Sequence, residues 1–400
     1  MQYRLDARSN TQLSVFALGG MRMSKDFAVC RQMVTEAHEA GVNYIDTAYV
    51  YSGSEEMFGR VLEDTGLRDK FYLATKLPLF LTKKYDDFDK YLNRQLERLK
   101  TDHIDYYLLH SLSGPEQLKR LRAIGIEDWI AAKRESGQIR RLGFSFHGRQ
   151  TDFLKLLEMR DWDFVQIQYN YSDPNYQAGV TGLKKAAALG IPVMVMEPLL
   201  GGRLADSLPR EAQEVFRKAN PERSLAGWGF RWLYDQPEVT LCLSGMSKPE
   251  FWRDNIATAN EAAPGMVTAE ERTVYDEVSK ILNKKTKVPC TGCAYCMPCP
   301  KGVNIPGCFS AYNARYAIKR STGIQQYIMN SGFISQDFTG AGACVGCKAC
   351  EKHCPQNIAV AEEMRAVRKT MEPLWWRIGH KAYHGRAVQG AMKLWQRNKK

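Results

Sequence analysis

A chain of 400 residues is long enough for more than one domain, although a single eight-stranded α/β barrel can use most of that length. Its 44% hydrophobic and 25% charged residues are the composition of an ordinary soluble protein. The start, MQYRLDARSNTQLSVFALGG, lacks an apolar core of signal-peptide length, and no run approaches a membrane span, so neither a signal peptide nor a membrane-spanning helix is expected. We therefore expect a cytoplasmic location.

Short apolar runs alternate with stretches of helical period through most of the chain. The runs are SVFALGG, NYIDTAY, FYLATKL, IDYYLLH, RLGFSF, FVQIQYN, PVMVME and TLCLSG, and the helical stretches begin at residues 27, 54, 86, 126, 151, 182, 224 and 249. Eight such pairs in roughly 260 residues predict an α/β fold, a closed (β/α)8 TIM barrel, over residues 1–285. A doubly wound open sheet is the alternative, but the Gly-x-Gly-x-x-Gly fingerprint of its dinucleotide sites does not follow the first strand.

Four ionisable residues lie at or just beyond the ends of three successive runs. Asp46 ends NYID with Tyr51 five residues later, Lys76 ends FYLATK, and His110 ends IDYYLLH. In a parallel barrel the carboxyl ends of the strands share one face, where catalytic groups gather. A tyrosine with its ordinary pKa of about 10 is a weak acid at neutral pH, and a neighbouring lysine would lower that pKa. Taken singly, each residue has a plain structural explanation, such as a helix cap for Asp46.

Together these residues resemble the Asp, Tyr, Lys, His tetrad of the aldo/keto reductases. In addition, GQIRRLGFSF resembles the family's fifth-strand motif, VQIQYN its sixth, and LSGMSKPEFWRDN its eighth strand and cofactor loop. The resemblance implies that NADH or NADPH lies across the barrel mouth. It assigns Ser145 and Gln166 to the nicotinamide carboxamide, Ser247, Lys248 and Asn255 to the adenosine phosphate and adenine, and the backbone of Gly245 and Met246 to their vicinity.

Three positions depart from the family pattern. Phe146 stands where well-known members carry an asparagine, Met196 where many carry the tyrosine that stacks on the nicotinamide, and Phe251 where an arginine grips the 2′-phosphate or adenine. Met196 is accordingly assigned to the nicotinamide site, and the alternative is that Phe146 and Met196 fill core. The absence of the arginine leaves NADH and NADPH as alternatives.

The resemblance also implies an oxidoreductase that interconverts a carbonyl and an alcohol. A hydride leaves the nicotinamide for the carbonyl carbon, and Tyr51 donates a proton to the oxygen as the general acid. Lys76 would lower the pKa of the tyrosine, Asp46 would hold the lysine charged, and His110 would position the carbonyl. The sequence does not name the small-molecule substrate.

Cysteines are concentrated after the barrel. Cys30 and Cys242 stand alone, whereas the other nine of the eleven fall within residues 290–354. In a reducing compartment such a concentration indicates metal rather than disulfides. The runs VPCTGCAYCMPCP and GACVGCKACEKHCP each end in a cysteine before proline. Zinc is an alternative for any one Cys-x-x-Cys pair, but two four-cysteine runs of this kind are specific for [4Fe-4S] clusters.

These two runs resemble the bacterial dicluster ferredoxins, in which the fourth cysteine of each run ligates the other cluster. The resemblance implies two [4Fe-4S] clusters in a small, mainly helical domain over residues 286–362, which includes the helical stretch IPGCFSAYNARYAIKR. One ligand set is Cys290, Cys293, Cys296 and Cys354, and the other is Cys344, Cys347, Cys350 and Cys299. Cys308 lies outside both runs and is expected to be a structural thiol.

The tail, residues 363–400, mixes tryptophans with basic residues. The net charge of the chain is +12, and residues 365–400 hold ten Lys and Arg against one acid, so most of the excess belongs to this tail. A helix with Trp375, Trp376 and Trp395 on one side would suit an anionic membrane surface or an acidic partner, and packing on the barrel is the alternative. Binding of nucleic acid is not expected, since no recognised module accompanies the charge.

A second class of function stays open beside the enzyme. The chain would then be an electron-transfer or interaction protein whose barrel is a docking or flavin-binding scaffold. A nicotinamide passes two electrons together and a cluster passes one, so a flavin is the usual converter between them. Either the barrel works alone with NAD(P)H and the clusters are structural or serve a redox protein partner, or a flavin near the barrel joins the two.

Overall fold

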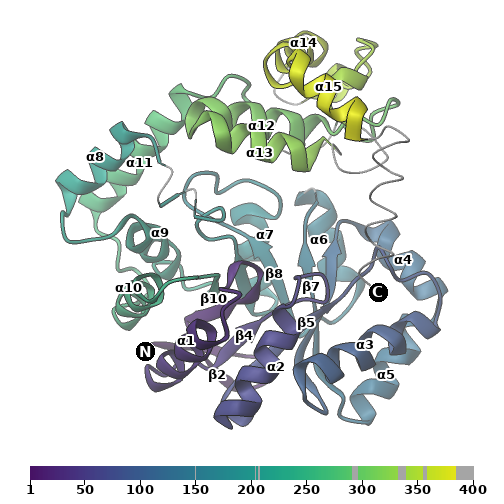
Figure 1. Cartoon of the computed structure of the whole chain (residues 1–400), viewed down its shortest axis with the longest axis vertical. Coiled ribbons are helices and arrows are strands. Elements are labelled where there is room, and N and C mark those ends of the chain that lie inside the picture. The colour runs from purple at the N-terminus through teal and green to yellow at the C-terminus, as the bar shows by residue number, and fades with distance from the viewer. Residues whose placement is uncertain are drawn as a thin grey trace. The chain divides into compact units, whose positions relative to one another are not determined.

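The computed structural model of the protein describes residues 1–148, 150–202, 204–205, 208–290, 296–331, 339–354 and 358–383. The chain divides into two compact units, one made of Met1–Leu208 and Gln213–Glu277 and the other of Pro209–Ala212 and Val278–Lys400 (Figure 1). The domain boundaries expected at residues 285 and 362 stay predictions. Within the part of the chain that is described, no helix is long and apolar enough to cross a membrane.

Eight parallel strands close into a barrel in the order β10-β3-β4-β5-β6-β7-β8-β9. Their bounds are β3 Phe16–Gly19, β4 Tyr44–Asp46, β5 Tyr72–Leu77, β6 Ile104–Leu112, β7 Ile139–Phe146, β8 Phe164–Gln168, β9 Val193–Met196 and β10 Val239–Ser244. Each strand coincides with one of the eight apolar runs, although β6 continues two residues beyond its run and β7 and β10 begin before theirs. The predicted (β/α)8 barrel is therefore confirmed, and the open-sheet alternative is wrong.

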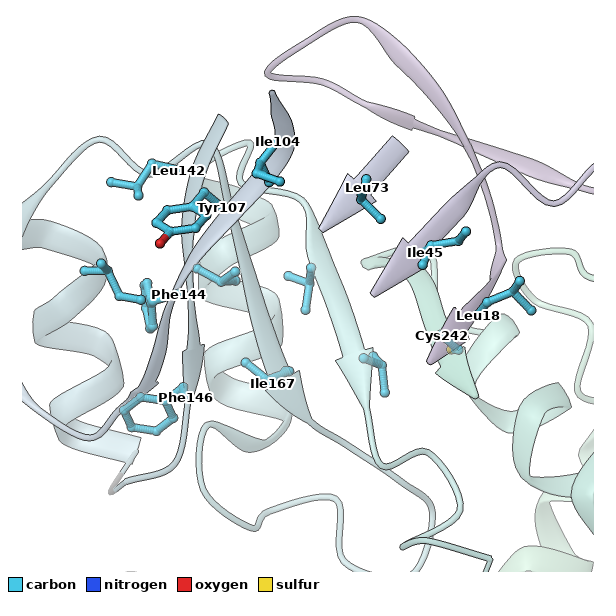
Figure 2. Packing of buried hydrophobic residues seen from close by; sticks show 14 of the residues in the cluster. Leu18, Ile45, Leu73, Ile104, Tyr107, Leu142, Phe144, Phe146, Ile167 and Cys242 are labelled. Atoms are coloured by element: carbon cyan, nitrogen blue, oxygen red, sulfur yellow. The ribbon is translucent and has the colours of Figure 1, made fainter. Parts of the chain in front are cut away.

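Neighbouring residues of the strands belong to different buried clusters, because successive strand side chains point to opposite faces. Tyr44 and Ala74 belong to the cluster that fills the barrel, whereas Ile45 and Leu73 pack with helix residues outside it. Figure 2 shows part of the outer cluster on neighbouring strands. Because both faces of these strands are buried, their sequences are continuous apolar runs and do not alternate between apolar and polar residues.

The helices of the barrel follow the predicted stretches. Those expected are α1 Phe27–Glu39, α2 Ser54–Thr65, α3 Asp86–Leu99, α5 Ile126–Glu135, α6 Gln150–Met159, α7 Gly179–Ala188, α9 Leu225–Tyr234 and α10 Pro249–Asn260. Local chemistry sets some of their ends: the Asp26 carboxylate accepts hydrogen bonds from the first amides of α1, and Gly66 ends α2 in the left-handed region. Not predicted were α4 Pro115–Ala123, α8 Arg210–Ala219, α11 Ala269–Lys284 and the 3-10 turns η1 Gly20–Arg22 and η2 Arg68–Lys70.

An antiparallel hairpin of β1 (Tyr3–Asp6) and β2 (Thr11–Ser14) precedes the barrel and was not predicted. Leu13 of this hairpin belongs to the cluster that fills the barrel interior, and the Tyr106 hydroxyl donates to Asp6 at 2.7 Å. The hairpin therefore closes one end of the barrel. Its four-residue strands are too short to give a readable period.

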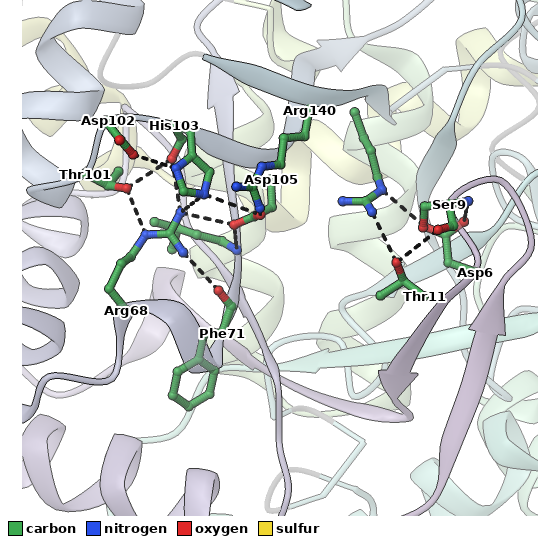
Figure 3. Close-up of polar contacts among 12 residues, drawn as sticks. Asp6, Ser9, Thr11, Arg68, Phe71, Thr101, Asp102, His103, Asp105 and Arg140 are labelled. Atoms are coloured by element: carbon green, nitrogen blue, oxygen red, sulfur yellow. Dashed lines mark hydrogen bonds and ion pairs between the residues drawn. The ribbon is translucent and has the colours of Figure 1, made fainter. Parts of the chain in front are cut away.

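A second polar cluster lies near the same end, where β6 begins (Figure 3). The buried Asp105 carboxylate pairs with Arg68 at 3.1 Å and Arg140 at 2.8 Å, and it accepts the Leu73 amide at 3.0 Å. Polar groups at the amino ends of barrel strands generally serve stability, which leaves the opposite face for chemistry.

The second unit has its own core around helices α12 Ile305–Ala317, α13 Arg320–Asn330, α14 Val360–Met371 and α15 Leu374–Tyr383, with 3-10 turns η3 Ala341–Ala343 and η4 Glu351–His353. The expected helical character is confirmed. The shared tryptophan face is wrong, because Trp376 is 3% exposed and packs against Tyr327 within this core, whereas Trp375 is 56% exposed. Trp395 lies outside the described residues.

Candidate active site and cluster cysteines

The carboxyl ends of three neighbouring barrel strands bring the predicted tetrad together. Asp46 is the last residue of β4, Lys76 is the last but one of β5, and His110 lies two residues before the end of β6. Tyr51 belongs to the loop that leads into α2. All four side chains are thus supplied from one face of the barrel, as the sequence predicts.

Lys76 and Asp46 form a buried ion pair. The Lys76 side chain is 1% exposed, its Nζ lies 2.5 Å from Asp46 Oδ1, and it also donates to the Thr47 carbonyl at 2.7 Å. The other carboxylate oxygen of Asp46 accepts from the Gln166 side chain at 2.9 Å. Buried charges persist only when they are paired and hydrogen-bonded, and this pair meets both conditions.

Tyr51 lies against this ion pair. The Lys76 ammonium lies 5.1 Å from the centroid of the tyrosine ring. Burial raises the pKa of Tyr51 above its ordinary value, while the charge of Lys76 acts to lower it and those of Asp46 and Glu197 act to raise it. Lys76 therefore acts in the predicted direction, but burial outweighs it.

His110 packs edge-on against Tyr51, with ring centroids 6.0 Å apart and an interplanar angle of 85°. Burial, together with the neighbouring Lys76 and His147, lowers the pKa of His110 to about 3. The imidazole is therefore neutral at neutral pH. Its Nδ1 atom is buried and has no hydrogen-bond partner among the described residues. A neutral ring of this kind can orient a polar group without carrying charge.

The residues assigned to the nicotinamide have other partners in the structure. The Ser145 hydroxyl accepts from the Ser111 amide at 2.8 Å, and the Gln166 amide donates to Asp46. Phe146 is buried against Phe153, with ring centroids 4.9 Å apart. It therefore fills core, which was the alternative interpretation of this position. Met196 is half-buried at the end of β9, against the cluster that fills the barrel.

A cavity of about 410 Å³ opens between the loops that follow β3, β9 and β10, and none of the four tetrad residues is part of its lining. Its lining includes Gly245, Met246, Ser247 and Asn255 of the predicted cofactor loop, whereas Lys248 is not part of it. Asn255 is buried and donates to Ser244 Oγ and to Met246 Sδ, both at 3.2 Å, so it fixes the shape of the loop. A Cβ on Gly245 would lie 3.2 Å from the Gly19 carbonyl, so this close approach favours glycine.

The charges on the cavity wall come mainly from residues that the sequence did not single out. Arg22 pairs with Glu197 at 3.4 Å, and the Ser224 hydroxyl donates to Asp254 at 2.6 Å. Glu197 and the nearby Leu200 adopt left-handed φ angles of 51° and 47°. A pair of glycines, Gly201 and Gly202, continues this turn, and their place after a strand was the signal available in the sequence.

In the second unit, one cavity is lined by four cysteines, Cys299, Cys344, Cys347 and Cys350. Burial raises the pKa of the Cys350 thiol, and the neighbouring Cys344 and Cys299 thiols add to this effect. The structure thus brings together the four residues of one expected ligand set.

The other expected set is described only in part. Cys290, Cys296 and Cys354 are half-buried against the core of the second unit, and Cys293 lies outside the described residues. Cys308 is fully buried and burial raises its pKa to about 12, which fits the expected structural thiol.

Comparison with known proteins decides the family. The model of the aldo/keto reductase family matches residues 15–270, and that of the 4Fe-4S dicluster domain matches residues 289–359. The chain belongs to the aldo/keto reductase family. It carries a 4Fe-4S dicluster domain after the reductase barrel.

Two curated aldo/keto reductase relatives have stated activities. The NADH-specific methylglyoxal reductase of Escherichia coli (strain K12) is 26% identical over 303 residues, which cover 63% of this chain and 90% of the relative. The 6-dehydroglucose reductase of Novosphingobium aromaticivorans is 28% identical over 232 residues, or 53% of this chain and 73% of the relative. This chain is accordingly an NAD(P)H-dependent oxidoreductase.

Solved structures of the family share the barrel. The holo form of aldo-keto reductase AKR11C1 from Bacillus halodurans superposes with a TM-score of 0.58 at 24% identity, covering 70% of this chain and 96% of that one. An aldo-keto reductase from Klebsiella pneumoniae in complex with NADPH gives 0.57 at 23% identity, covering 70% and 95%. At this identity the likeness shows the fold alone.

The reductase site also rests on a buried network that the sequence analysis missed. Gln95 of α3 donates to Glu55 at 2.9 Å and to the main-chain carbonyl of Lys76 at 3.0 Å. Arg98 pairs with Glu55 at 3.1 Å. These residues lie on helices rather than at strand ends, and a polar residue on an amphipathic helix is ordinarily read as solvent-exposed.

Proposed function

We propose that this reductase transfers hydride between NAD(P)H and the carbonyl group of a small molecule, with Tyr51 as the general acid. The observation that carries the proposal is the buried Lys76–Asp46 ion pair, whose ammonium lies 5.1 Å from the centroid of the Tyr51 ring. A buried lysine ammonium beside a tyrosine stabilises the phenolate left after the proton is given up. His110, neutral and adjacent, orients the carbonyl oxygen toward Tyr51.

The roles of the chain's residues follow from their contacts. When bound, the nicotinamide supplies the hydride. Tyr51 donates its proton to the carbonyl oxygen, and Lys76 stabilises the resulting negative charge on Tyr51. Asp46 holds the Lys76 side chain in place, and Gln166 keeps Asp46 aimed at Lys76.

The cavity between the loops that follow β3, β9 and β10 fits part of an extended dinucleotide. It has room for a sizeable ligand, at about 410 Å³, and glycines along its wall let backbone approach the ligand closely. We assign Gly245, Met246 and Ser247 to the cofactor loop, Lys248 to its exposed edge, and Asn255 to the support of the loop. Ser145, Gln166 and Met196 are assigned to the nicotinamide end, where Ser145 and Gln166 would have to share their hydrogen bonds with the carboxamide.

We further propose that the dicluster domain binds two [4Fe-4S] clusters. Cysteine thiolates are the ligands that such clusters require. Cys299, Cys344, Cys347 and Cys350, which line one cavity, would hold the first cluster. Cys290, Cys293, Cys296 and Cys354 would hold the second. The clusters would supply one-electron transfer.

The barrel and the clusters are proposed to work without direct exchange of electrons. The tetrad is sufficient for hydride transfer, so the clusters serve structure or a separate redox partner, and the alternative is a flavin that joins the two. NAD(P)H added anaerobically to oxidised, flavin-free protein should leave the EPR signal of reduced clusters absent. Cluster reduction without added flavin or partner would overturn this arrangement.

Replacement of Tyr51 by Phe tests the proposed chemistry. The variant keeps the ring and loses the proton donor, so the Kd for NAD(P)H should change less than about threefold while carbonyl reduction falls by about 10²-fold or more. Methylglyoxal and 6-dehydroglucose are suitable test substrates, since two relatives are named as reductases of these compounds. Unchanged turnover in the variant would contradict the role of Tyr51.

A further inference from the structure

The cavity lined by four cysteines opens to solvent on one side. Cys347 is the only exposed cysteine among those described, and Val345 beside it is 62% exposed. The other three cysteines of the cavity are half-buried. A group held there would be reached most directly from the surface around Cys347.

This surface is positively charged. Lys301 and Lys348 line the cavity and are exposed, and no acidic residue is among the described residues of its lining. Lys352 is exposed on the following turn, η4. The nearby Glu351 is half-buried and its carboxylate accepts the Ala361 amide at 2.9 Å, at the start of α14.

The charge of the whole second unit has the same sign. Residues 278–400 contain 20 Lys and Arg against five Asp and Glu, whereas the rest of the chain contains 36 against 39. The net positive charge of the chain therefore lies after residue 277, in the cysteine-bearing segment and, for the larger part, in residues 365–400 that follow it. A field of one sign steers an oppositely charged protein toward it and raises the association rate.

We propose that Lys301, Val345, Cys347 and Lys348, here called the cysteine face, dock an acidic one-electron carrier protein. This inference rests on the proposed binding of a cluster by Cys299, Cys344, Cys347 and Cys350. A small apolar centre surrounded by charged residues is typical of the weak, transient interfaces of redox proteins. In each encounter one electron passes between the carrier and the cluster, so that one is oxidised and the other reduced by one electron.

Calorimetry with anaerobically purified, full-length protein tests this docking, with a flavodoxin as the acidic probe. The wild type should bind flavodoxin, and the Kd should rise about tenfold or more between about 20 mM and about 300 mM NaCl, since exposed charges are screened by salt. The variant Lys301→Glu/Lys348→Glu should weaken binding at low salt by about tenfold or more. Because Lys348 has a left-handed φ of 58°, Lys301→Glu/Lys352→Glu is made in parallel and should act in the same direction.

Lys319→Glu is the matched control, because Lys319 is exposed at the start of α13 and does not line the cavity. It should change the Kd less than about threefold, and basic cytochrome c should not bind at the cysteine face. Equal binding by the wild type and both double variants, or no binding of flavodoxin, would overturn the proposal. Binding to phosphatidylserine vesicles instead, lost in the double variants, would identify an anionic membrane as the partner and also overturn it.

The iron and sulfide contents of each sample distinguish a failure of the docking proposal from a failure of the cluster-binding proposal on which it rests. Wild-type protein without iron or acid-labile sulfide would contradict the proposed clusters and remove the basis for docking. Wild-type protein with both, but with lysine-independent binding, would contradict docking alone.

Discussion

The side-chain amide of Gln95 donates a hydrogen bond to the main-chain carbonyl of Lys76 at 3.0 Å, which fixes helix α3 to the strand that carries the buried lysine. Gln95 also donates to Glu55, and its own oxygen accepts the Tyr107 hydroxyl at 2.7 Å. One buried side chain thus connects α2, α3, β5 and β6 beneath the tetrad. We regard Gln95 as a positioning residue for Lys76.

Replacement of Gln95 by Leu should lower both stability and turnover. The variant leaves buried groups of Glu55 and Tyr107 with fewer partners, at a cost of about 1–3 kcal/mol for each unsatisfied group. A displaced Lys76 should reduce kcat more than it raises KM. Urea unfolding and steady-state kinetics measure the two effects, and Gln32→Leu, on the exposed face of α1, is the control. A stable variant with unchanged kcat would contradict the positioning role.

The Lys76–Asp46 pair gives a prediction that separates stability from catalysis. Lys76→Met leaves the carboxylate of Asp46 buried without its cation and should destabilise the barrel by about 3–5 kcal/mol. The double variant Lys76→Met/Asp46→Asn removes both charges and should recover most of that stability in denaturant unfolding. Carbonyl reduction should stay low in both variants. Recovery of activity in the double variant would contradict the role of the lysine charge.

The low pKa of His110 predicts a dependence of stability on pH. The folded protein holds this histidine neutral down to a pKa of about 3, whereas the unfolded chain protonates it near its ordinary value of 6.5. Between these values the unfolded state binds more protons, so stability falls as pH falls, by up to about 1.4 kcal/mol per pH unit. His110→Asn should flatten this slope in urea unfolding from pH 7 to pH 5. An equal slope in both proteins would contradict the assignment.

Phe251 provides a test of cofactor choice. Among the described residues that line the cavity, Arg22 is the one cation, and it already pairs with Glu197. We therefore expect NADH to be preferred over NADPH, because a 2′-phosphate would lack a dedicated partner. Phe251→Arg should raise the NADPH/NADH ratio of kcat/KM by about tenfold or more, the effect of one charge-assisted hydrogen bond. Phe251→Met is the control and should leave the ratio within about threefold.

Residues at strand ends were the part of the site that the sequence predicted best. Asp46, Lys76 and His110 were found because the apolar runs of a parallel barrel end where its chemistry begins. Gln95 and Glu55 were missed, since helix periodicity does not distinguish a polar residue that faces solvent from one that faces a buried partner. The hydrogen bond between Gln166 and Asp46 could not be predicted either, because it joins two strands whose residues are 120 apart in sequence.

Other predictions failed or changed for local reasons. Trp375 and Trp376 are sequence neighbours, and neighbours on a helix point in directions about 100° apart, so a shared face for the pair was a weak expectation. Phe146 points away from the barrel interior and packs on Phe153 of α6, because residues of β7 alternate between the barrel interior and the helices outside it. The position therefore fills core, and no contact with a nicotinamide is needed to explain it.

The two units have separate buried cores, with Val15 to Ala262 bounding the larger cluster and Val288 to Trp376 bounding the other. Air oxidation destroys exposed iron–sulfur clusters and leaves aliphatic cores intact, so oxygen damage should unfold one core and spare the other. Air-inactivated protein should then keep a cooperative thermal transition of the barrel and its reactivity with NAD(P)H while it loses iron. Only the C-terminal unit would then be sensitive to oxygen, and the barrel would still transfer hydride after the clusters were lost.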